Sequence, residues 1–258
     1  GVIPDPSGLT FNNDGTKMFV SGSTGAGVAE YTLSTAFDVS TASHVDTLSV
    51  SAQDTYPKGH AFNSDGTKMF VVGLTGRDVN EYTLSTGFDV STASFVDSFS
   101  VSSQESAPVG ITFNTDGTKM FVIGHSGADV NEYTLSTGFD VSTASYDSSF
   151  SVSSQEIYPS SVTFSNDGKK MFVIGINDDE VNEYSLSTGF DVSTASFVGN
   201  FSVSPLVSAP NCLAFNNDGT KMFVGDHMGK DINEYTLTTP FSLVDVSGEH
   251  TGDVIDTS

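Results

Sequence analysis

The chain is poor in several residue types, and each shortage excludes a class of protein or partner. Among its 258 residues there is no Trp, one cysteine (Cys212), and nine Lys or Arg against 32 Asp or Glu. A single cysteine excludes an intrachain disulfide but does not identify a compartment. The net charge of −23 argues against nucleic acid and anionic membranes as partners, because phosphate-rich surfaces are bound by basic ones.

Long apolar runs are also missing. No stretch approaches the roughly 18 apolar residues of a membrane-spanning helix, so we expect no membrane insertion. Charged residues are only 16% of the chain and apolar residues 37%, which indicates a folded core rather than disorder. The chain starts with Gly, inside its own sequence pattern, and we therefore expect it to be part of a longer protein.

What the chain does contain is a repeat of 51 residues. The segment FNNDGTKMFV at 11–20 returns, with few changes, at 62–71, 113–122, 164–173 and 215–224. A second segment, AEYTLST at 29–35, returns in step with it. Repeats of this length are typical of repeat architectures such as propellers and solenoids. We expect one domain made of five units, at about 1–51, 52–102, 103–153, 154–204 and 205–258.

Each unit contains four strand patterns. In the second unit they lie at 59–63, 68–73, 79–85 and 95–102, and they are rich in β-branched and aromatic residues. Between the first two stands a turn in which Asp65 accepts local hydrogen bonds and Gly66 takes a positive φ. Four antiparallel strands per repeat are typical of a β-propeller. We predict an all-β fold, a single closed five-bladed β-propeller with four antiparallel strands per blade.

The two ends of the chain depart from the repeat. The last unit replaces the FDVSTAS segment of the others by PFSLVDVSGEHTGDVIDTS. Its outer strand, within Leu243–Asp256, is therefore expected to be degenerate. Because both ends fall between units, we expect the ring to close by packing alone, with no strand exchanged between the termini.

The Phe-x-x-Asp-Gly-Thr-Lys-Met-Phe-Val segment resembles the hairpin of YVTN-type, lactonase-like and WD-like propeller repeats. The resemblance extends over all five units, and it implies a propeller blade. Because repeats of this kind occur in enzymes, receptors and surface proteins, the resemblance does not select an activity.

Two constant motifs have structural explanations. The Asp-Gly-Thr-Lys turn fails as a calcium loop, because Thr10 and Ser21 stand where acidic ligands are needed; we expect a plain turn with Lys17 near Asp14. A glutamate recurs in every third strand, and we expect it to accept backbone or hydroxyl hydrogen bonds, since buried carboxylates must be paired. A five-fold ligand contact is the alternative. These glutamates are Glu30, Glu81, Glu132, Glu183 and Glu234.

The units differ mainly in two places, the segment before the first strand and the loop between the second and third strands. In a propeller both lie on one face, which we call the variable-loop face. The opposite face, formed by the Asp-Gly turns and the FDVSTAS segments, hardly varies, and we call it the constant face. The candidate ligand-binding residues distinguish the units from one another, and they are Tyr56, Lys58, His60, Arg77, His125, Tyr158, His227 and Lys230.

The densest group of oxygen ligands follows the second strand of the fourth unit. It contains Asp178, Asp179 and Glu180, and oxygen-rich loops suit hard cations. We treat these residues as a weak candidate calcium site, with a solvated polar loop as the alternative. No other metal or cofactor is expected.

Together these features favour a non-catalytic, monomeric binding module whose protein or carbohydrate ligand sits on the variable-loop face. Catalysis needs distinct groups in asymmetric positions, and the innermost strand patterns carry no carboxylate. Three alternatives stay open: a scaffold or spacer of a surface protein, a multivalent lectin-like binder using Asn80, Glu81, Tyr82 and their counterparts, and a hydrolase or lactonase-like enzyme. The acidic composition suits an extracellular, cell-surface or virion-surface setting.

Overall fold

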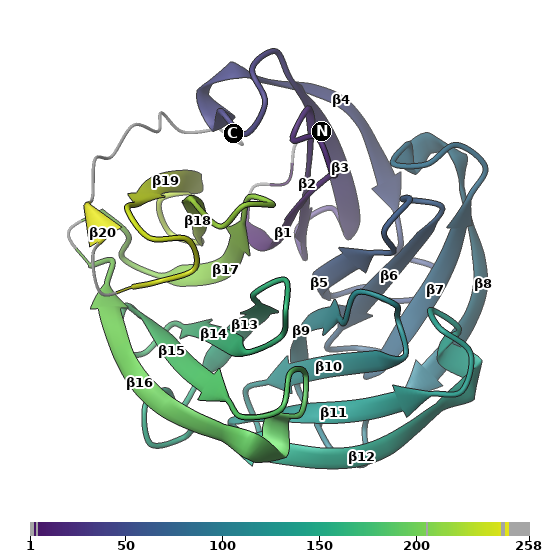
Figure 1. The fold of residues 1–258 in the computed structure, drawn as a ribbon. Helices are drawn as coiled ribbons and strands as arrows, with labels where there is room; N and C mark the ends of the chain where they lie inside the picture. Colours follow the sequence, from purple (N-terminus) through teal and green to yellow (C-terminus); the bar gives the residue numbers. More distant parts are fainter. Residues whose placement is uncertain (1–2, 4, 205, 244–245, 248–258) are drawn as a thin grey trace.

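The computed structural model describes residues 3, 5–204, 206–243 and 246–247. They form five sheets of four antiparallel strands, which stand as blades around a central axis (Figure 1). Within each sheet the strands are neighbours in chain order. The predicted closed five-bladed propeller is therefore confirmed.

The strand bounds repeat from blade to blade. Blade 1 contains β1 (Pro6–Phe11), β2 (Lys17–Gly22), β3 (Gly27–Leu33) and β4 (Ala42–Ser49). Blade 2 contains β5 (Pro57–Phe62), β6 (Lys68–Gly73), β7 (Asp78–Leu84) and β8 (Ala93–Ser100). Blade 3 contains β9 (Pro108–Phe113), β10 (Lys119–Gly124), β11 (Asp129–Leu135) and β12 (Ala144–Ser151). Blade 4 contains β13 (Pro159–Phe164), β14 (Lys170–Gly175), β15 (Glu180–Leu186) and β16 (Ala195–Ser202). Blade 5 contains β17 (Pro210–Phe215), β18 (Lys221–Asp226), β19 (Asp231–Leu237) and β20 (Val246–Ser247).

Short 3-10 helices precede the fourth strands of the first four blades. They are η1 (Val39–Thr41), η2 (Val90–Thr92), η3 (Val141–Thr143) and η4 (Val192–Thr194). An Asp begins each of them, and Asp140, for example, accepts a hydrogen bond from the Ser142 N–H at 3.1 Å. No helix among the described residues is both long and apolar enough to cross a membrane.

The first strand of each blade is the innermost. β1 contacts β5 and β17, β5 contacts β9, and β13 contacts both β9 and β17, so the five innermost strands form a complete circle. Apolar side chains fill the space between adjacent blades: one cluster joins Phe70 of blade 2 to Met120 and Tyr133 of blade 3, all of them fully or almost fully buried. Each blade therefore buries both faces, which explains why the Met-Phe-Val segment of its second strand places apolar side chains on both sides of the sheet.

An ion pair repeated in every blade fastens that blade to the next. Lys68 Nζ lies 2.7 Å from Glu81 Oε1 and also donates to the carbonyl oxygen of Phe139 in blade 3 at 2.6 Å. Glu81 Oε2 accepts a hydrogen bond from the N–H of Val141, also in blade 3, at 3.1 Å. The other four pairs are Lys17–Glu30, Lys119–Glu132, Lys170–Glu183 and Lys221–Glu234. The expectation that these glutamates have a structural role is confirmed.

The expected partner of the turn lysine was wrong. Lys17 lies 2.6 Å from Glu30, whereas Asp14 accepts from the N–H and the hydroxyl of Thr16 within its own turn. In the register of β2 and β3, Phe19 is opposite Glu30 and Lys17 is opposite Thr32. Lys17 and Glu30 are therefore diagonal neighbours on one side of the sheet, within reach of a long side chain.

The constant face is shaped by a glycine and a phenylalanine that require each other. Gly117 has a φ of +71°, and a Cβ added there would lie 2.2 Å from the Phe139 ring. Phe139 itself has a φ of 58°, an unusual conformation for a bulky residue. Its carbonyl oxygen is held by Lys68, so the ion pair, the Asp-Gly turn and the FDVSTAS segment form one structural unit.

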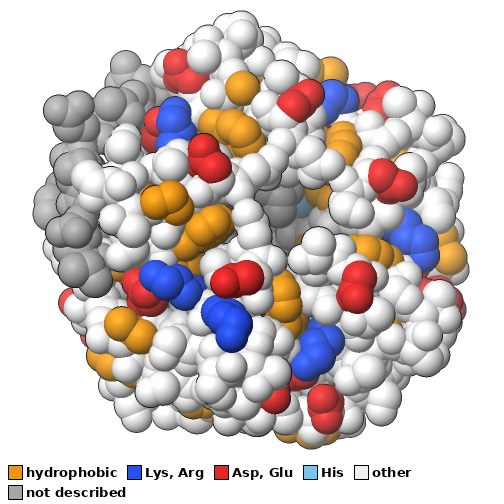
Figure 2. All heavy atoms as spheres, viewed as in Figure 1, with side chains coloured by type: hydrophobic (Ala, Val, Ile, Leu, Met, Phe, Trp, Pro, Cys, Tyr) orange, Lys and Arg blue, Asp and Glu red, His pale blue; other side chains and the backbone are white. Residues whose placement is uncertain are grey.

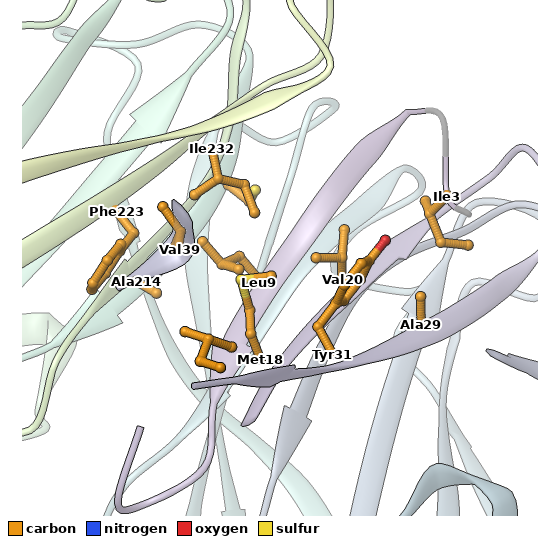
Figure 3. Close-up of a cluster of buried hydrophobic side chains, with 12 residues drawn as sticks. Ile3, Leu9, Met18, Val20, Ala29, Tyr31, Val39, Ala214, Phe223 and Ile232 are labelled. Carbon is orange, nitrogen blue, oxygen red and sulfur yellow. The ribbon is translucent and has the colours of Figure 1, made fainter. Parts of the chain in front are cut away.

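The ring closes between blades 5 and 1. A buried cluster there joins Leu9 and Met18 of blade 1 to Phe223 and Ile232 of blade 5 (Figure 3). Lys221 Nζ also donates to the Phe37 carbonyl oxygen at 3.0 Å. Within the described residues no terminal strand joins the sheet of the other end, and the rest of both termini lies outside the described residues. Of the outer strand expected within 243–256, the structure describes only β20, Val246–Ser247, and the rest lies outside the described residues.

Candidate functional site

The two variable segments of each blade meet on one face. The Leu74 N–H donates to the carbonyl oxygen of Tyr56 at 3.1 Å, and the Ile176 N–H donates to that of Tyr158 at 3.3 Å. These bonds join the loop between the second and third strands to the segment before the first strand. In these blades the two variable segments are therefore held together by backbone hydrogen bonds on the variable-loop face.

Buried carboxylates hold these loops in place, and the sequence reasoning missed them. Asp54, 1% exposed, accepts from the backbone N–H groups of Tyr56 at 2.6 Å and Gly76 at 2.9 Å. Glu105 accepts in the same way from Ala107 at 2.7 Å and Gly127 at 3.0 Å. The signal was available, because an acid stands at 54, 105 and 156 in step with the repeat.

In blade 5 a carboxylate at a different position of the repeat holds the loops. Val207 occupies the repeat position of the acid, and Asp226 stands where the other blades have glycine. Asp226 accepts from the N–H groups of Ser208 and Met228, both at 2.9 Å. Burial raises the pKa of this carboxyl, but the hydrogen bonds from Ser208, Gly229 and Met228 outweigh it and bring the pKa below its ordinary value.

Four of the eight candidate residues form a cluster contributed by blades 2, 3 and 4. Lys58 Nζ lies 4.9 Å from the centre of the Tyr56 ring, and the rings of His125 and Tyr158 lie 6.2 Å apart and perpendicular. Burial, and then the positive charge of Lys58, lower the pKa of His125, which keeps its imidazole neutral near pH 7. Tyr56 and Tyr158 are 46% and 48% exposed. This four-residue cluster offers two open aromatic rings beside a cation.

The other four candidates lie elsewhere. His60 is 3% exposed and is not on the face: its Nδ1 is 2.8 Å from Ser21 Oγ and its Nε2 is 2.8 Å from Thr10 Oγ1. Burial lowers the pKa of His60 to about 3, so it is a neutral residue of the junction between blades 1 and 2. The remaining candidates are exposed on loops of blades 2 and 5, outside the four-residue cluster, and they are Arg77, His227 and Lys230.

Exposed apolar side chains are concentrated on the variable-loop face of blades 4 and 5. We call this group the apolar patch: it consists of Ile157, Tyr158, Ile176, Leu206 and Met228, between 39% and 73% exposed. The other exposed large apolar side chains of the described chain, apart from Tyr56, lie on the fourth strands, and none lies in the turns or connections of the constant face. The sequence signal was that Leu206 replaces a Gln found in the three preceding units.

The weak calcium candidates make contacts of their own. Asp178 accepts from Asn177 Nδ2 at 2.7 Å, and Glu180 accepts from Asn200 Nδ2. The pKa of Asp179 is raised by burial and by the charges of Asp226 and Asp178, so these three carboxyl groups are near one another. In the part of the chain that the structure describes, no group of three or more His, Cys, Asp or Glu side chains is placed to hold a metal ion.

The residues expected to serve a multivalent lectin are buried. Asn80, Glu81 and Tyr82 are only 2%, 2% and 3% exposed. Asn80 donates to Asp78 at 2.9 Å, and Glu81 belongs to the ion pair that joins the blades. A ligand cannot contact them in the folded ring, so burial argues against the alternative of repeated sites built from these residues.

A cavity of about 320 Å³ runs along the innermost strands at the centre of the ring. Figure 2 shows one face of the ring with this central hollow, around which basic and acidic side chains are mixed. Of the described residues that line the cavity, none is Asp, Glu, Lys or Arg. The lining therefore provides neither a carboxylate for general acid–base chemistry nor a cation for a phosphate group.

Comparison with known proteins gives the fold alone. No protein-family model matches the chain, and no curated protein matches its sequence. Among solved structures, a functionally unknown protein from Desulfotomaculum acetoxidans has a TM-score of 0.57 at 17% identity, over 96% of this chain and 72% of that one. A putative 6-phosphogluconolactonase from Bacteroides fragilis has a TM-score of 0.58 at 15% identity, over 95% and 70%.

A third structure, the periplasmic gluconolactonase PpgL of Pseudomonas aeruginosa, has a TM-score of 0.54 at 16% identity, over 96% of this chain and 70% of that one. The resemblance of the repeat to lactonase-like propellers is thus confirmed at the level of the fold. At such low identities it does not extend to activity.

Proposed function

We propose that the ring is a non-catalytic interaction module that binds a protein partner through its variable-loop face. The observation that carries the proposal is the apolar patch, whose exposed members include Met228 at 73% and Tyr158 at 48%. Exposed apolar groups gathered on one face of a folded protein mark interaction surfaces. Aromatic residues and Met are also enriched at the centre of protein interfaces.

The scaffold beneath the patch supports this role. Asp226 fixes the backbone that carries Met228, and Glu156 fixes the backbone of Tyr158 through a 2.7 Å bond to its N–H. Loops that are ordered before binding lose less conformational entropy when a partner arrives. The four-residue cluster, which shares Tyr158 with the patch, extends the same surface towards blade 2 and adds the cation of Lys58.

A hydrolase of the lactonase kind is the second candidate, and its support is the shared fold. The lining of the central cavity makes it the weaker one. The described residues of the lining include no cation for a phosphorylated substrate. The imidazole among them, that of His60, is hydrogen-bonded to Ser21 and Thr10 and has a pKa of about 3, which makes it a poor general base near pH 7. We expect no turnover of gluconolactone or 6-phosphogluconolactone. The acidic composition supports placing the module outside the cell or on a cell or virion surface.

A selection against the isolated ring tests the proposal. A displayed random-peptide library and a protein pull-down supply ligands, and a glycan array runs beside them. We expect the selected protein ligands to lose at least tenfold in affinity for the double variant Tyr158→Ala/Ile176→Ser. The matched control is Phe197→Ala/Val198→Ser on β16, which removes exposed apolar groups of similar size from the outer rim and should leave affinity unchanged.

Two outcomes contradict the proposal. Ligands that bind the patch variant as tightly as the unaltered ring would place the site elsewhere. A complete lack of ligands at any salt concentration would favour the alternative of a structural scaffold or spacer.

A further inference from the structure

The central cavity lies between the innermost strands, it is lined by none of the described residues of the loops between second and third strands, and it narrows at the end nearest the variable-loop face. The innermost strands converge there: a Cβ added to Gly59 would lie 2.7 Å from the Val109 carbonyl oxygen, and one added to Gly110 would lie 2.9 Å from that of Ser160. At the opposite end the lining includes Asn13, Ser64 and Thr115, which are exposed residues of the Asp-Gly turns. The cavity therefore opens on the constant face.

One position in these turns makes the opening asymmetric. It is Asn in three blades, and each of these Asn side chains donates a hydrogen bond to a backbone carbonyl oxygen of the next blade. Asn166 Nδ2 donates to the carbonyl oxygen of Asn217 at 2.7 Å. Asn217 donates in the same way to Asn13, and Asn13 to Ser64. Blades 2 and 3 have Ser64 and Thr115 instead. Their shorter side chains cannot make the same bridge, so the cavity mouth lies on this side of the ring.

The lining is uncharged but rich in hydrogen-bonding groups. His60 is held neutral between Ser21 and Thr10. Thr112 and Thr163 are partly exposed along the wall, and the buried hydroxyl of Ser160, near the narrow end, has no partner among the described residues. A charged ligand would lose its hydration here without gaining an opposite charge, so the wall selects against anions and cations.

Aromatic rings complete the wall. Phe62 and Phe113 lie near the mouth and are partly exposed. The centre of the Phe62 ring is 5.4 Å from that of Phe88, and the centre of the Phe113 ring is 5.4 Å from that of Phe139. A cavity that combines apolar and aromatic surface with a few hydroxyls is typical of small-molecule sites. The volume of about 320 Å³ stands at the small end of the roughly 300–1,000 Å³ range of such sites.

We propose that this cavity binds a neutral polyhydroxy compound of monosaccharide size, which enters from the constant face. Its hydroxyls bond to Thr112, Thr163 and the backbone of the innermost strands, and its C–H surfaces pack against Phe62 and Phe113. The proposal does not depend on the protein-binding function of the opposite face.

Ligand-observed NMR on the full chain tests the proposal with D-glucose, D-galactose and D-mannose as probes. Glucose 6-phosphate and gluconate are the anionic counterparts, and glucosamine is the cationic one. We expect at least one neutral sugar to bind with a Kd on the order of 1 mM, and each charged counterpart to bind at least tenfold more weakly. The variant Thr112→Val/Thr163→Val, which removes two hydroxyls at constant shape, should weaken binding at least tenfold.

The matched control is Thr83→Val/Thr134→Val, the same change at exposed positions on β7 and β11, which should bind as the unaltered ring does. Tyr158→Ala on the variable-loop face should also leave sugar binding unchanged, so a failure of either proposal can be told from a failure of the other. Equal binding of glucose and glucose 6-phosphate would overturn the proposal. So would no binding of any neutral sugar at tens of millimolar, or no effect of the Thr112→Val/Thr163→Val change.

Discussion

The constant and variable-loop faces of the ring are built from the same repeat but by opposite strategies. On the constant face every blade repeats the same ion pair and the same glycine–phenylalanine contact, such as Lys68 with Glu81 and Gly117 with Phe139. On the variable-loop face the stabilising carboxylate changes position, from Asp54 in blade 2 to Asp226 in blade 5. The residues that are constant between repeats join neighbouring blades, and the residues that vary determine which side chains are exposed to a partner.

Breaking the ion pair of the constant face should give the largest loss of stability. Glu81→Ala leaves Lys68 without its carboxylate and the Val141 N–H without its acceptor. Removing one partner of a buried pair costs about 3–5 kcal/mol. We expect about 3 kcal/mol, at the lower end of that range, because the Lys68 side chain is 28% exposed and stays partly hydrated. Urea unfolding measures it.

The control for this prediction is Asp97→Ala, which removes an exposed acid of β8 and should change the free energy of unfolding by no more than about 0.5 kcal/mol. If the two variants were equally stable, the ion pair would not be what fastens blade 2 to blade 3.

The junction of blades 1 and 2 should lose stability in mild acid. The pKa of His60 is about 3 in the folded ring because of burial, and about 6.5 in an unfolded chain. The unfolded state therefore takes up this proton first as the pH falls below about 6.5, and stability is lost from there down to about pH 3. Between pH 7 and pH 5 we expect a loss of about 2 kcal/mol from this group.

The matched variant is His60→Leu, which gives blade 2 the kind of aliphatic residue present in the other blades, such as Leu9. Urea unfolding at pH 7 and pH 5 should show a smaller loss of stability for the variant than for the unaltered ring. Equal losses in both proteins would mean that His60 is not the titrating group.

Blade 4 lacks a side-chain hydrogen bond that three other blades have, and a single substitution should restore it. In three other blades an Asp at the start of the third strand accepts a bond from an Asn, as in Asn131 to Asp129 at 2.9 Å. Blade 4 has Glu180 there, which bonds to Asn200 instead, and the buried Asn182 has no partner among the described residues. We expect Glu180→Asp to raise the free energy of unfolding by about 1 kcal/mol, measured by urea unfolding.

The reverse change in blade 3, Asp129→Glu, is the control and should lower stability by a similar amount, about 1 kcal/mol. Stabilisation by the Asp129→Glu change, or destabilisation by Glu180→Asp, would show that the Asn–Asp bond does not set the difference between these blades.

The sequence predicted the features that depend on local pattern and period. The strands of blade 2 were predicted within two residues of their observed starts and ends, and the buried role of Glu81 followed from the rule that buried carboxylates are paired. The partner of Lys17 was not predicted, because it depends on the register between two strands. The transfer of the loop-holding acid from the position of Val207 to Asp226 was missed because Asp226 meets the segment after Val207, at Ser208, only in space.

The candidate site was predicted in part. Tyr56, Lys58, His125 and Tyr158 come together because the ring brings the loops of three blades to one face. His60 was assigned to the same face because the other units have an aliphatic residue at its position. A residue on a strand can also differ between units because it packs at the junction between two blades, as His60 does between blades 1 and 2. The apolar patch was missed because the comparison of units followed charge and His rather than exposed aliphatic groups.

The smallest effect on stability is expected at the apolar patch. Ile176→Ser removes an exposed side chain, 43% accessible, and should change the free energy of unfolding by no more than about 0.5 kcal/mol. A loss of more than about 1 kcal/mol would show that the variable-loop face contributes to the stability of the ring in the way that the constant face does.

The most direct measurement of the central claim is the footprint of a selected protein ligand on the ring, by amide hydrogen exchange. We predict that the ligand slows exchange in 156–160, 176–180, 206–209 and 226–230, the segments of blades 4 and 5 that carry the apolar patch. A smaller effect is expected in 54–58. Exchange in the turns of the constant face, 63–67 and 114–118, should not change. Protection confined to those turns or to the outer strands, with the loops of blades 4 and 5 unaffected, would contradict the account.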